Sequence, residues 1–463
     1  MTQPPAPEVE PGPHREGVEP GSGRVVGVEV AFREVYGQAV ATLIRVFGDI
    51  TVAEDAVQDA FVIATDRWSR EGIPPNPAGW IITTARNRAI DDLRRSARGR
   101  ELHEQLAVEA SNDPGDDGQE SGPVSDDRLR LTFTCCHPAL RMEHQVALTL
   151  RLLGGLSVEE VARAFLVAEP AMAKRLVRAK FKIKAADIRY RVPSDADLPA
   201  RVRSVLAVLY LIYNTGRDDP ARAALRQEGI RLARALVELM PDEAEAWGLL
   251  AVILLCESRE ASRRHRGSVV LLRDQDRSTW NHGLIEEGHA IVRACIRRDQ
   301  PGPYQLQAAI QAVHCNAARY DETDWSQIVE LYDHLLALMP TPMVALNRAI
   351  AMGEVKGPSA ALEVIDALAP QLDAYHLMHA ARGTLLRRLG HSDAARDAFQ
   401  RAADLAVLDS DQRFLTEQLE EINHLDPVDR IDRFADHVTP TLLRVVTSER
   451  CTGHLHAAWA DQR

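Results

Sequence analysis

The sequence has few aromatic residues and few cysteines, and it lacks any long apolar run. Aromatic side chains make up 5% of the 463 residues, within a hydrophobic fraction of 45%. No segment approaches the roughly 20 consecutive apolar residues that a membrane-spanning helix needs. Residues 1–23 lack the basic and apolar segments of a secretory signal. We therefore expect a globular protein that neither crosses nor binds a membrane.

The six cysteines are scattered along the chain except for the adjacent pair Cys135-Cys136. A chain of this length can bury a sufficient core without disulfide bonds. The pattern therefore favours a reducing compartment, and we expect the protein in the cytoplasm.

An excess of positive charge is also missing, because 67 acidic residues outnumber 55 Lys and Arg and give a net charge of -12. This balance excludes nucleic-acid binding by the whole surface but allows local basic patches. The sequence contains no P-loop, G-x-S-x-G, H-E-x-x-H or dinucleotide-binding motif. We expect no enzyme, no cofactor and no metal.

The composition favours helices, because alanine, leucine and arginine are abundant, and it predicts an all-α protein. Changes in composition divide the chain into five parts. These are a disordered leader (1–27), a helical block (28–98), an acidic flexible linker (99–125), a compact helical block (126–191) and a long helical region (194–463).

The first helical block contains two signals of function. Thr51 to Glu54 has the form of a capping box. In the helix that follows, apolar residues form one stripe, and acidic residues lie on a different face. A second helix opens near Trp80 and becomes steadily more basic, which suggests contact with nucleic acid, although an ordinary surface helix with solvated arginines is the alternative. Trp80 would either stack on a base or anchor the helix in the core. The acidic face carries Asp55, Gln58 and Asp59, and the candidate DNA contacts are Trp80, Arg86, Asn87, Arg88, Asp91, Arg94 and Arg95.

The second helical block has the order helix, short turn, basic helix, which is typical of a helix-turn-helix motif. Ser157 to Glu160 forms a second capping box, and a break follows near Val167 to Pro170. A solvated run of charge on a helical bundle is the alternative. The basic helix would place its early residues near base edges in the major groove. Its candidate contacts are Ala171, Lys174, Arg175, Arg178, Lys180 and Lys182.

Cysteine and histidine occur together at Cys135-Cys136-His137 and at His314-Cys315. Adjacent cysteines are a poor zinc chelate, since ligand pairs usually have the spacing C-x2-C, and no fourth ligand is evident nearby. We interpret both groups as core residues.

The C-terminal region repeats itself. Gly383, Gly390, Ala395, Phe399 and Ala402 follow tetratricopeptide spacing, and Ala361 lies one period of about 34 residues before Ala395. A Met-Pro pair at Met240-Pro241 recurs at Met339-Pro340. Stacked helix pairs of this kind form surfaces that suit protein partners.

These residues resemble a known family. The segment from Ala53 to Phe61, with the helix from Trp80 to Arg95, resembles region 2 of the sigma-70 family. Asp126 to Lys184 resembles region 4, and regions 1.1 and 3 have no counterpart, as in the extracytoplasmic-function (ECF) sigma factors of bacteria. The segments that resemble the ECF subgroup with a long tetratricopeptide-like extension are Asp274 to Ser278, Gly302 to Ile310, Asp324-Trp325 and Val344 to Ala349.

The resemblance implies a mechanism of transcription initiation. The acidic face would bind the β′ clamp of core RNA polymerase, region 4 would meet the β flap, and the two basic helices would contact the minus-ten and minus-thirty-five promoter elements. The loop from Ser69 to Pro77 would receive a flipped base, and the C-terminal region would regulate the factor or bind a partner. One departure is the turn Ala168 to Met172, which lacks the small polar groups common in related factors, so we expect weak base readout there.

Two alternatives remain at this stage. The first is a helix-turn-helix regulator that binds duplex DNA without polymerase and senses a ligand or protein through the repeats. The second is a scaffold built on the repeat region, in which the N-terminal half is degenerate.

Overall fold

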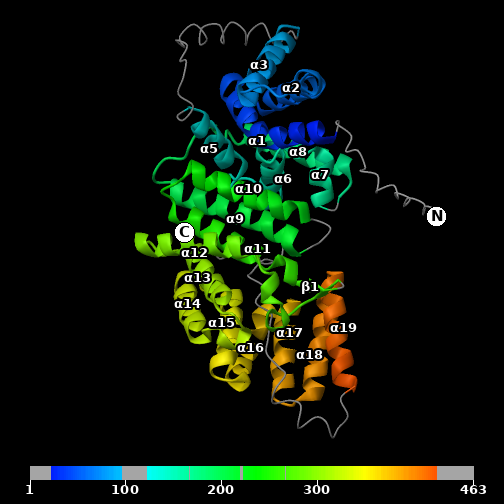
Figure 1. Cartoon of the computed structure of the whole chain (residues 1–463), viewed down its shortest axis with the longest axis vertical. Coiled ribbons are helices and arrows are strands. Elements are labelled where there is room, and N and C mark those ends of the chain that lie inside the picture. Colours follow the sequence, from blue (N-terminus) through cyan, green and yellow to red (C-terminus); the bar gives the residue numbers. More distant parts are fainter. Residues whose placement is uncertain (1–21, 96–122, 166, 219–222, 266, 425–463) are drawn as a thin grey trace, which may run out of the picture. The chain divides into compact units, whose positions relative to one another are not determined.

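The computed structural model describes residues 22–95, 123–165, 167–218, 223–265 and 267–424. These residues form helices almost throughout, and the only regular strands among them are the two-residue pair β1 (Arg264–His265) and β2 (Ser268–Val269), which is antiparallel. The all-α prediction is confirmed (Figure 1). None of the described helices is long and apolar enough to cross a membrane.

The chain divides into two compact units whose boundaries differ from the expected ones. Unit 1 comprises Met1–Thr134, Ala147–Val161 and Met172–Val192, and unit 2 comprises Cys135–Val146, Ala162–Ala171 and Pro193–Arg463. The second helical block is therefore shared between the two units, and the expected boundary near 194 does not separate it from the C-terminal region.

The described residues up to 192 form eight elements, and Figure 1 labels the α-helices among them. They are α1 (Ser22–Phe47), α2 (Ile50–Glu71), α3 (Pro77–Arg95), α5 (Pro123–Cys135), α6 (Met142–Leu148), the π-helix η1 (Thr149–Leu153), α7 (Val158–Ala164) and α8 (Glu169–Ala185). Helix α1 packs against both α2 and α3. The fully buried Tyr36, Leu43 and Ile81 lie on these helices.

Three helix starts differ from the sequence prediction. Helix α1 begins at Ser22, inside the predicted leader, the rest of which lies outside the described residues. Helix α5 begins at Pro123, inside the predicted linker, the rest of which lies outside the described residues. Helix α2 begins earlier than the predicted capping box.

The prediction of a capping box at Thr51 to Glu54 is wrong. Asp49 caps α2 instead, because its carboxylate accepts hydrogen bonds from the backbone N–H groups of Thr51 and Val52 at 2.8 and 3.2 Å. The second capping box is confirmed at the start of α7. The Ser157 backbone donates to Glu160 at 2.7 Å, and the Glu160 backbone donates to the Ser157 hydroxyl at 3.0 Å.

Unit 2 continues as a series of helices, and from α13 onward each packs against the next. They are α9 (Leu198–Asp218), α10 (Ala223–Leu239), α11 (Ala244–Glu257), α12 (His282–Arg298), α13 (Pro303–Asn316), α14 (Trp325–Leu338), α15 (Pro342–Val355), α16 (Pro358–Leu372), α17 (His376–Arg388), α18 (Ser392–Leu405) and α19 (Asp409–His424). Short 3-10 turns η3 (Glu260–Ser262), η4 (Leu272–Asp274) and η5 (Arg277–Thr279) surround the β pair, and η6 (Tyr320–Glu322) precedes α14.

The repeat pattern corresponds to helix pairs. Helices α17 and α18 pack closely at Gly383, where an added Cβ would lie 3.0 Å from the Phe399 ring. Ala361 and Ala395, one period apart, are both fully buried. The two Met-Pro segments also have equivalent roles, because α10 ends just before Met240 and α14 just before Met339.

Helices α11 and α13 approach each other at Gly248. A Cβ there would lie 2.7 Å from the backbone nitrogen of Gln305. The close approach brings Glu245 to the start of α13, where its carboxylate accepts from the backbone N–H groups of Tyr304 and Gln305 at 2.9 and 3.2 Å. Glu245 thus caps a helix whose own N-cap, Gly302, has no side chain to do so.

We predict that Gly248→Ala destabilises the protein by about 1–3 kcal/mol, because the backbone of α13 cannot yield as a flexible side chain would. Gly283→Ala on the exposed first turn of α12 is the control and should be near neutral or stabilising, since alanine favours helix over glycine. Urea unfolding measures both. A Gly248→Ala protein as stable as the control would contradict the close approach.

Candidate polymerase and promoter interface

Helix α2 buries one face and leaves the expected polymerase-binding residues on another. Ala53, Ala56 and Val57 belong to its buried stripe. Asp55 is exposed, whereas Gln58 and Asp59 are half-buried. Partial burial and the neighbouring Glu54 carboxylate raise the pKa of Asp55 above its ordinary value. The structure thus keeps the three candidates on one helix beside a buried carboxylate.

That buried carboxylate, Glu54, is the central polar contact of unit 1. The side chain is 4% exposed. Its Oε1 accepts from the Arg151 Nε at 2.5 Å, and its Oε2 pairs with the Lys180 ammonium. Arg151 also donates to the Leu156 carbonyl at 2.7 Å and lies over the Tyr36 ring at 5.9 Å. Glu54 therefore joins α2 to η1 and α8, which belong to the second helical block.

Three further contacts support the same junction. Arg45 on α1 donates to Asp127 on α5 at 2.8 Å. The Tyr190 hydroxyl bonds the carbonyls of Ala41 and Asp127 at 2.8 and 2.9 Å. Gly37 on α1 leaves no room for a Cβ, which would lie 2.8 Å from the Leu153 carbonyl oxygen. The helices from the two predicted blocks thus form one closed core in unit 1.

Helix α3 presents a basic, exposed face. Its buried residues Ile81, Ala85 and Ala89 follow helical spacing, which leaves the opposite side to solvent. The candidates exposed on α3 are Arg86, Asn87, Asp91, Arg94 and Arg95, and Arg88 is half-buried. Arg95 lies 3.2 Å from Asp92 and Arg94 lies 4.0 Å from Asp91, at exposures where such pairs contribute little. The arginines therefore stay accessible to phosphate groups.

Trp80 lies half-buried at the start of α3. Its ring meets the buried Trp68 edge-on at 5.4 Å, and Arg67 lies over it at 5.9 Å. The preceding loop is shorter than predicted, because α2 continues to Glu71 and α3 starts at Pro77. Gly72 takes a positive φ of 87° there. Trp80 thus anchors the helix start through its contact with Trp68.

Asn76 caps α3, because its side-chain oxygen accepts from the Gly79 backbone at 2.8 Å.

Helix α8 has a buried stripe and an exposed basic face. Met172, Leu176, Ala179 and Ile183 are buried. The exposed candidates are Ala171, Lys174, Arg178 and Lys182, and Arg175 is half-buried. Lys180 differs from its expected role, because its ammonium is paired with Glu54 and lies away from the others. From its charge alone, Lys180 could not be distinguished in the sequence from the exposed lysines of the same helix.

Cys135 and Cys136 are buried in the core and neither forms a disulfide bond, whereas His137 is half-buried, which corrects the expectation for this residue. Within the described ranges, no three His, Cys, Asp or Glu side chains cluster to hold a metal ion. The His137 Nδ1 accepts from the Ala139 backbone at 3.1 Å. His314 is also buried, as predicted, at 1% exposure.

Comparison with known proteins identifies the class. The sigma-70 region 2 family matches residues 31–99, and a family of unknown function, DUF6596, matches residues 201–296. The ECF RNA polymerase sigma factor SigL of Mycobacterium tuberculosis is 30% identical over 162 residues, which cover 88% of SigL and 34% of this chain. An uncharacterized protein of Rhizobium meliloti is 40% identical over 404 residues, 96% of that protein and 85% of this chain.

A helical protein with a sigma-70 region 2 is an RNA polymerase sigma factor, a class whose members interact with core RNA polymerase and promoter DNA. The chain belongs to the ECF sigma factors of the sigma-70 family, and it carries a long helical C-terminal extension. The DUF6596 match covers α9 to most of α12, so this extension opens with a segment distinct from the later repeat pairs.

We predict that Glu54→Ala destabilises unit 1 by about 3–5 kcal/mol, because the change leaves Arg151 buried without its carboxylate. The matched control on the same helix is Glu71→Ala. Glu71 pairs with Arg67 at 2.7 Å, but both side chains are more than half exposed, so the loss should stay below about 1 kcal/mol. Chemical denaturation measures both. Equal losses would refute the central role of Glu54.

We also predict that stability depends on pH through His137. Partial burial and the nearby Arg201 lower the pKa of this histidine to about 4. Because this pKa is lower in the folded than in the unfolded state, the folded protein loses stability as the pH falls from about 6.5 toward 4. Above about pH 6.5 the imidazole is neutral in both states, and the loss is absent. Protonation also removes the Nδ1 acceptor. His137→Gln keeps an acceptor and cannot be protonated there. As the pH falls from 7 to 4.5, the stability of His137→Gln should therefore rise relative to that of the unmodified chain. The same difference in unfolding free energy at both pH values would contradict the lowered pKa of His137.

Proposed function

We propose that this ECF sigma factor recruits core RNA polymerase through the α2 face that carries Asp55, Gln58 and Asp59. Helix α3 then meets the minus-ten element and α8 the minus-thirty-five element. The role is one of binding and strand opening, with no catalysis by this chain, and it is exercised in the cytoplasm. The observation that carries the proposal is the exposed basic face of α3, a helix that packs against α2, together with the exposed Asp55 on α2.

The two DNA-binding roles differ in what they read. Arginines on α3 would hold phosphates, which gives affinity but little sequence information. The loop between α2 and α3 would receive the flipped base. On α8, Lys174, Arg175 and Arg178 would supply most contacts, because Ala171 offers no polar group and Lys180 lies off the exposed face of the helix.

The closed core of unit 1 must open for this function. The two promoter elements are about 25 base pairs apart, or roughly 85 Å of duplex at 3.4 Å per base pair. Helix α2, roughly 33 Å long at 1.5 Å per residue, contacts α3 on its length and α8 through Glu54. Both elements therefore cannot be engaged while Glu54 holds α8. The Glu54 pairs set part of the cost of opening.

We further propose that the C-terminal region regulates the factor. Support comes from the division of the chain, since Cys135–Val146 and Ala162–Ala171 belong to unit 2. The turn before α8 and most of α6 thus belong to the same unit as the extension. Removal of the residues after 194 would take away part of that unit, so regulation is better tested by point changes in the full chain.

The test is run-off transcription with core RNA polymerase and the full chain at limiting concentration. Glu54→Gln should increase transcript several-fold, because a larger fraction of the factor is open, and each 1.4 kcal/mol corresponds to about tenfold. Glu71→Gln, whose ion pair is exposed, should behave as the unmodified chain. Arg178→Gln should reduce promoter binding without loss of core binding.

Failure of the full chain and of Glu54→Gln to bind core polymerase in a pull-down would overturn the recruitment proposal. Core binding together with unchanged transcription by Glu54→Gln would instead refute only the role of opening.

A further inference from the structure

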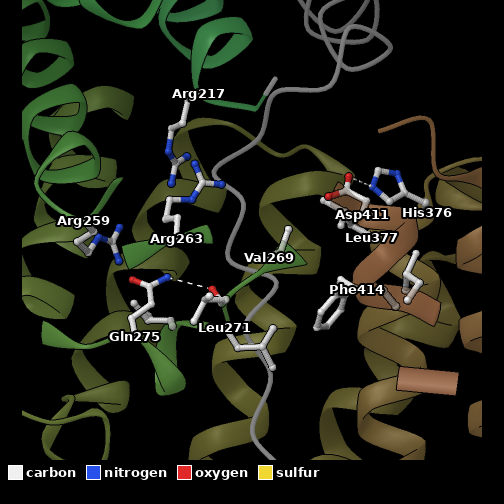
Figure 2. A pocket seen from close by; sticks show the side chains of 14 residues that line it. Arg217, Arg259, Arg263, Val269, Leu271, Gln275, His376, Leu377, Asp411 and Phe414 are labelled. Carbon is white, nitrogen blue, oxygen red and sulfur yellow. Dashed lines mark hydrogen bonds and ion pairs between the residues drawn. The ribbon is translucent and has the colours of Figure 1, made fainter. Parts of the chain in front are cut away.

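Unit 2 contains a cavity that none of the functions above uses. One side comes from α9 and the turns after α11, and the other comes from α17 and α19. Its volume of about 50 Å³ compares with about 10–15 Å³ for one ordered water. It therefore has room for a small charged group. Figure 2 shows arginines on one side of this space and His376, Asp411, Leu377 and Phe414 on the other.

The arginine side of the cavity is buried. Arg217, Arg259 and Arg263 line it and are 4%, 7% and 8% exposed. The carboxylate of Glu260 lies close by, at 3.1 Å from Arg263 and 3.8 Å from Arg217. The same carboxylate also meets Arg264 at 2.9 Å and Arg226 at 3.3 Å. This carboxylate thus meets four guanidinium groups, one of which, Arg226, also pairs with Glu257 at 2.9 Å.

Arg259 is held differently, by neutral groups. Its guanidinium donates to the side-chain oxygen of Gln311 and lies over the Trp280 ring at 5.7 Å. Its Nε finds no hydrogen-bond partner among the described residues. Arg277 lies over the same ring at 4.7 Å, so a second positive charge is near. A buried charge without an opposite charge is costly, and an anion in the cavity would offset this cost.

The opposite side of the cavity combines a polar pair with apolar surface. His376 and Asp411 are joined at 3.1 Å. Leu377 and Phe414 are buried beside them. The Gln275 side chain, which also lines the cavity, donates to the Val270 carbonyl at 3.2 Å. A ligand here would meet guanidinium groups at one end and an apolar surface at the other.

We propose that this cavity binds a small organic anion, with its carboxylate or phosphate against Arg259 and Arg263 and its apolar part against Leu377 and Phe414. Guanidinium groups suit both kinds of anion, because their donors match two oxygens at once. The binding site joins α9 and the turns after α11 to the last helices of the extension. Ligand binding is a property of unit 2 and does not require polymerase.

The test measures thermal stability and binding heat of the full chain with three probes at constant ionic strength: inorganic phosphate, phenyl phosphate and benzoate. We expect saturable stabilisation, since a ligand that binds only the folded state raises its stability. Phenyl phosphate should bind more tightly than inorganic phosphate, because it also covers the apolar surface. Preference between phenyl phosphate and benzoate distinguishes a phosphate from a carboxylate ligand.

Arg259→Gln should weaken binding of the preferred probe at least tenfold. The matched control Arg382→Gln on α17, which removes a partly exposed pair with Asp366 on α16, should leave binding unchanged. Val269→Phe narrows the cavity at a half-buried position and provides a second test that keeps every arginine. This change should weaken the binding of phenyl phosphate more than the binding of inorganic phosphate.

The proposal is overturned if none of the three probes stabilises the full chain beyond an equal concentration of chloride. It is also overturned if Arg259→Gln and Val269→Phe both fold and both bind the preferred probe with the affinity of the unmodified chain. Because neither measurement includes polymerase or DNA, these failures are separate from failure of the recruitment proposal.

Discussion

The buried carboxylate of Glu54 is the interaction on which the closed form of unit 1 depends. A carboxylate at 4% exposure is tolerated only with full ionic partners, and here both partners come from the second helical block. The same contact that satisfies this charge also holds α8 beside α2. Under the proposed function, stability of the closed form and access to promoter DNA are opposed. Such a factor would rest in an inactive form without a separate inhibitor bound to it.

Much of the fold could be predicted from local sequence pattern. Helical periodicity, the reciprocal Ser157–Glu160 cap and the repeat spacing around Gly383 depend on residues a few positions apart, and each is present. The sigma-factor class followed from segments of the same local kind, and the match to region 2 confirms it. Of the interface residues, the exposed arginines of α3 were recognisable because apolar spacing fixes the opposite face.

The errors of the sequence analysis have a common physical cause, which is contact between distant segments. Glu54 fits a capping box locally, yet its partner Arg151 is 97 residues away. Lys180 looks like any other lysine of a basic helix until Glu54 is placed beside it. The arginine cavity escaped notice for the same reason, since its two sides come from segments more than a hundred residues apart. Division of the second helical block between two units is likewise invisible to composition.

Under the proposed function, the closed core of unit 1 opens when the factor binds core polymerase and promoter DNA. The most direct measurement is the distance between spin labels at Asp66 on α2 and Ala185 on α8, both exposed and outside the proposed DNA contacts, in the full chain. We expect a single short distance in the free chain and a much longer one after core polymerase and promoter DNA are added. The same short distance in an active promoter complex would contradict it.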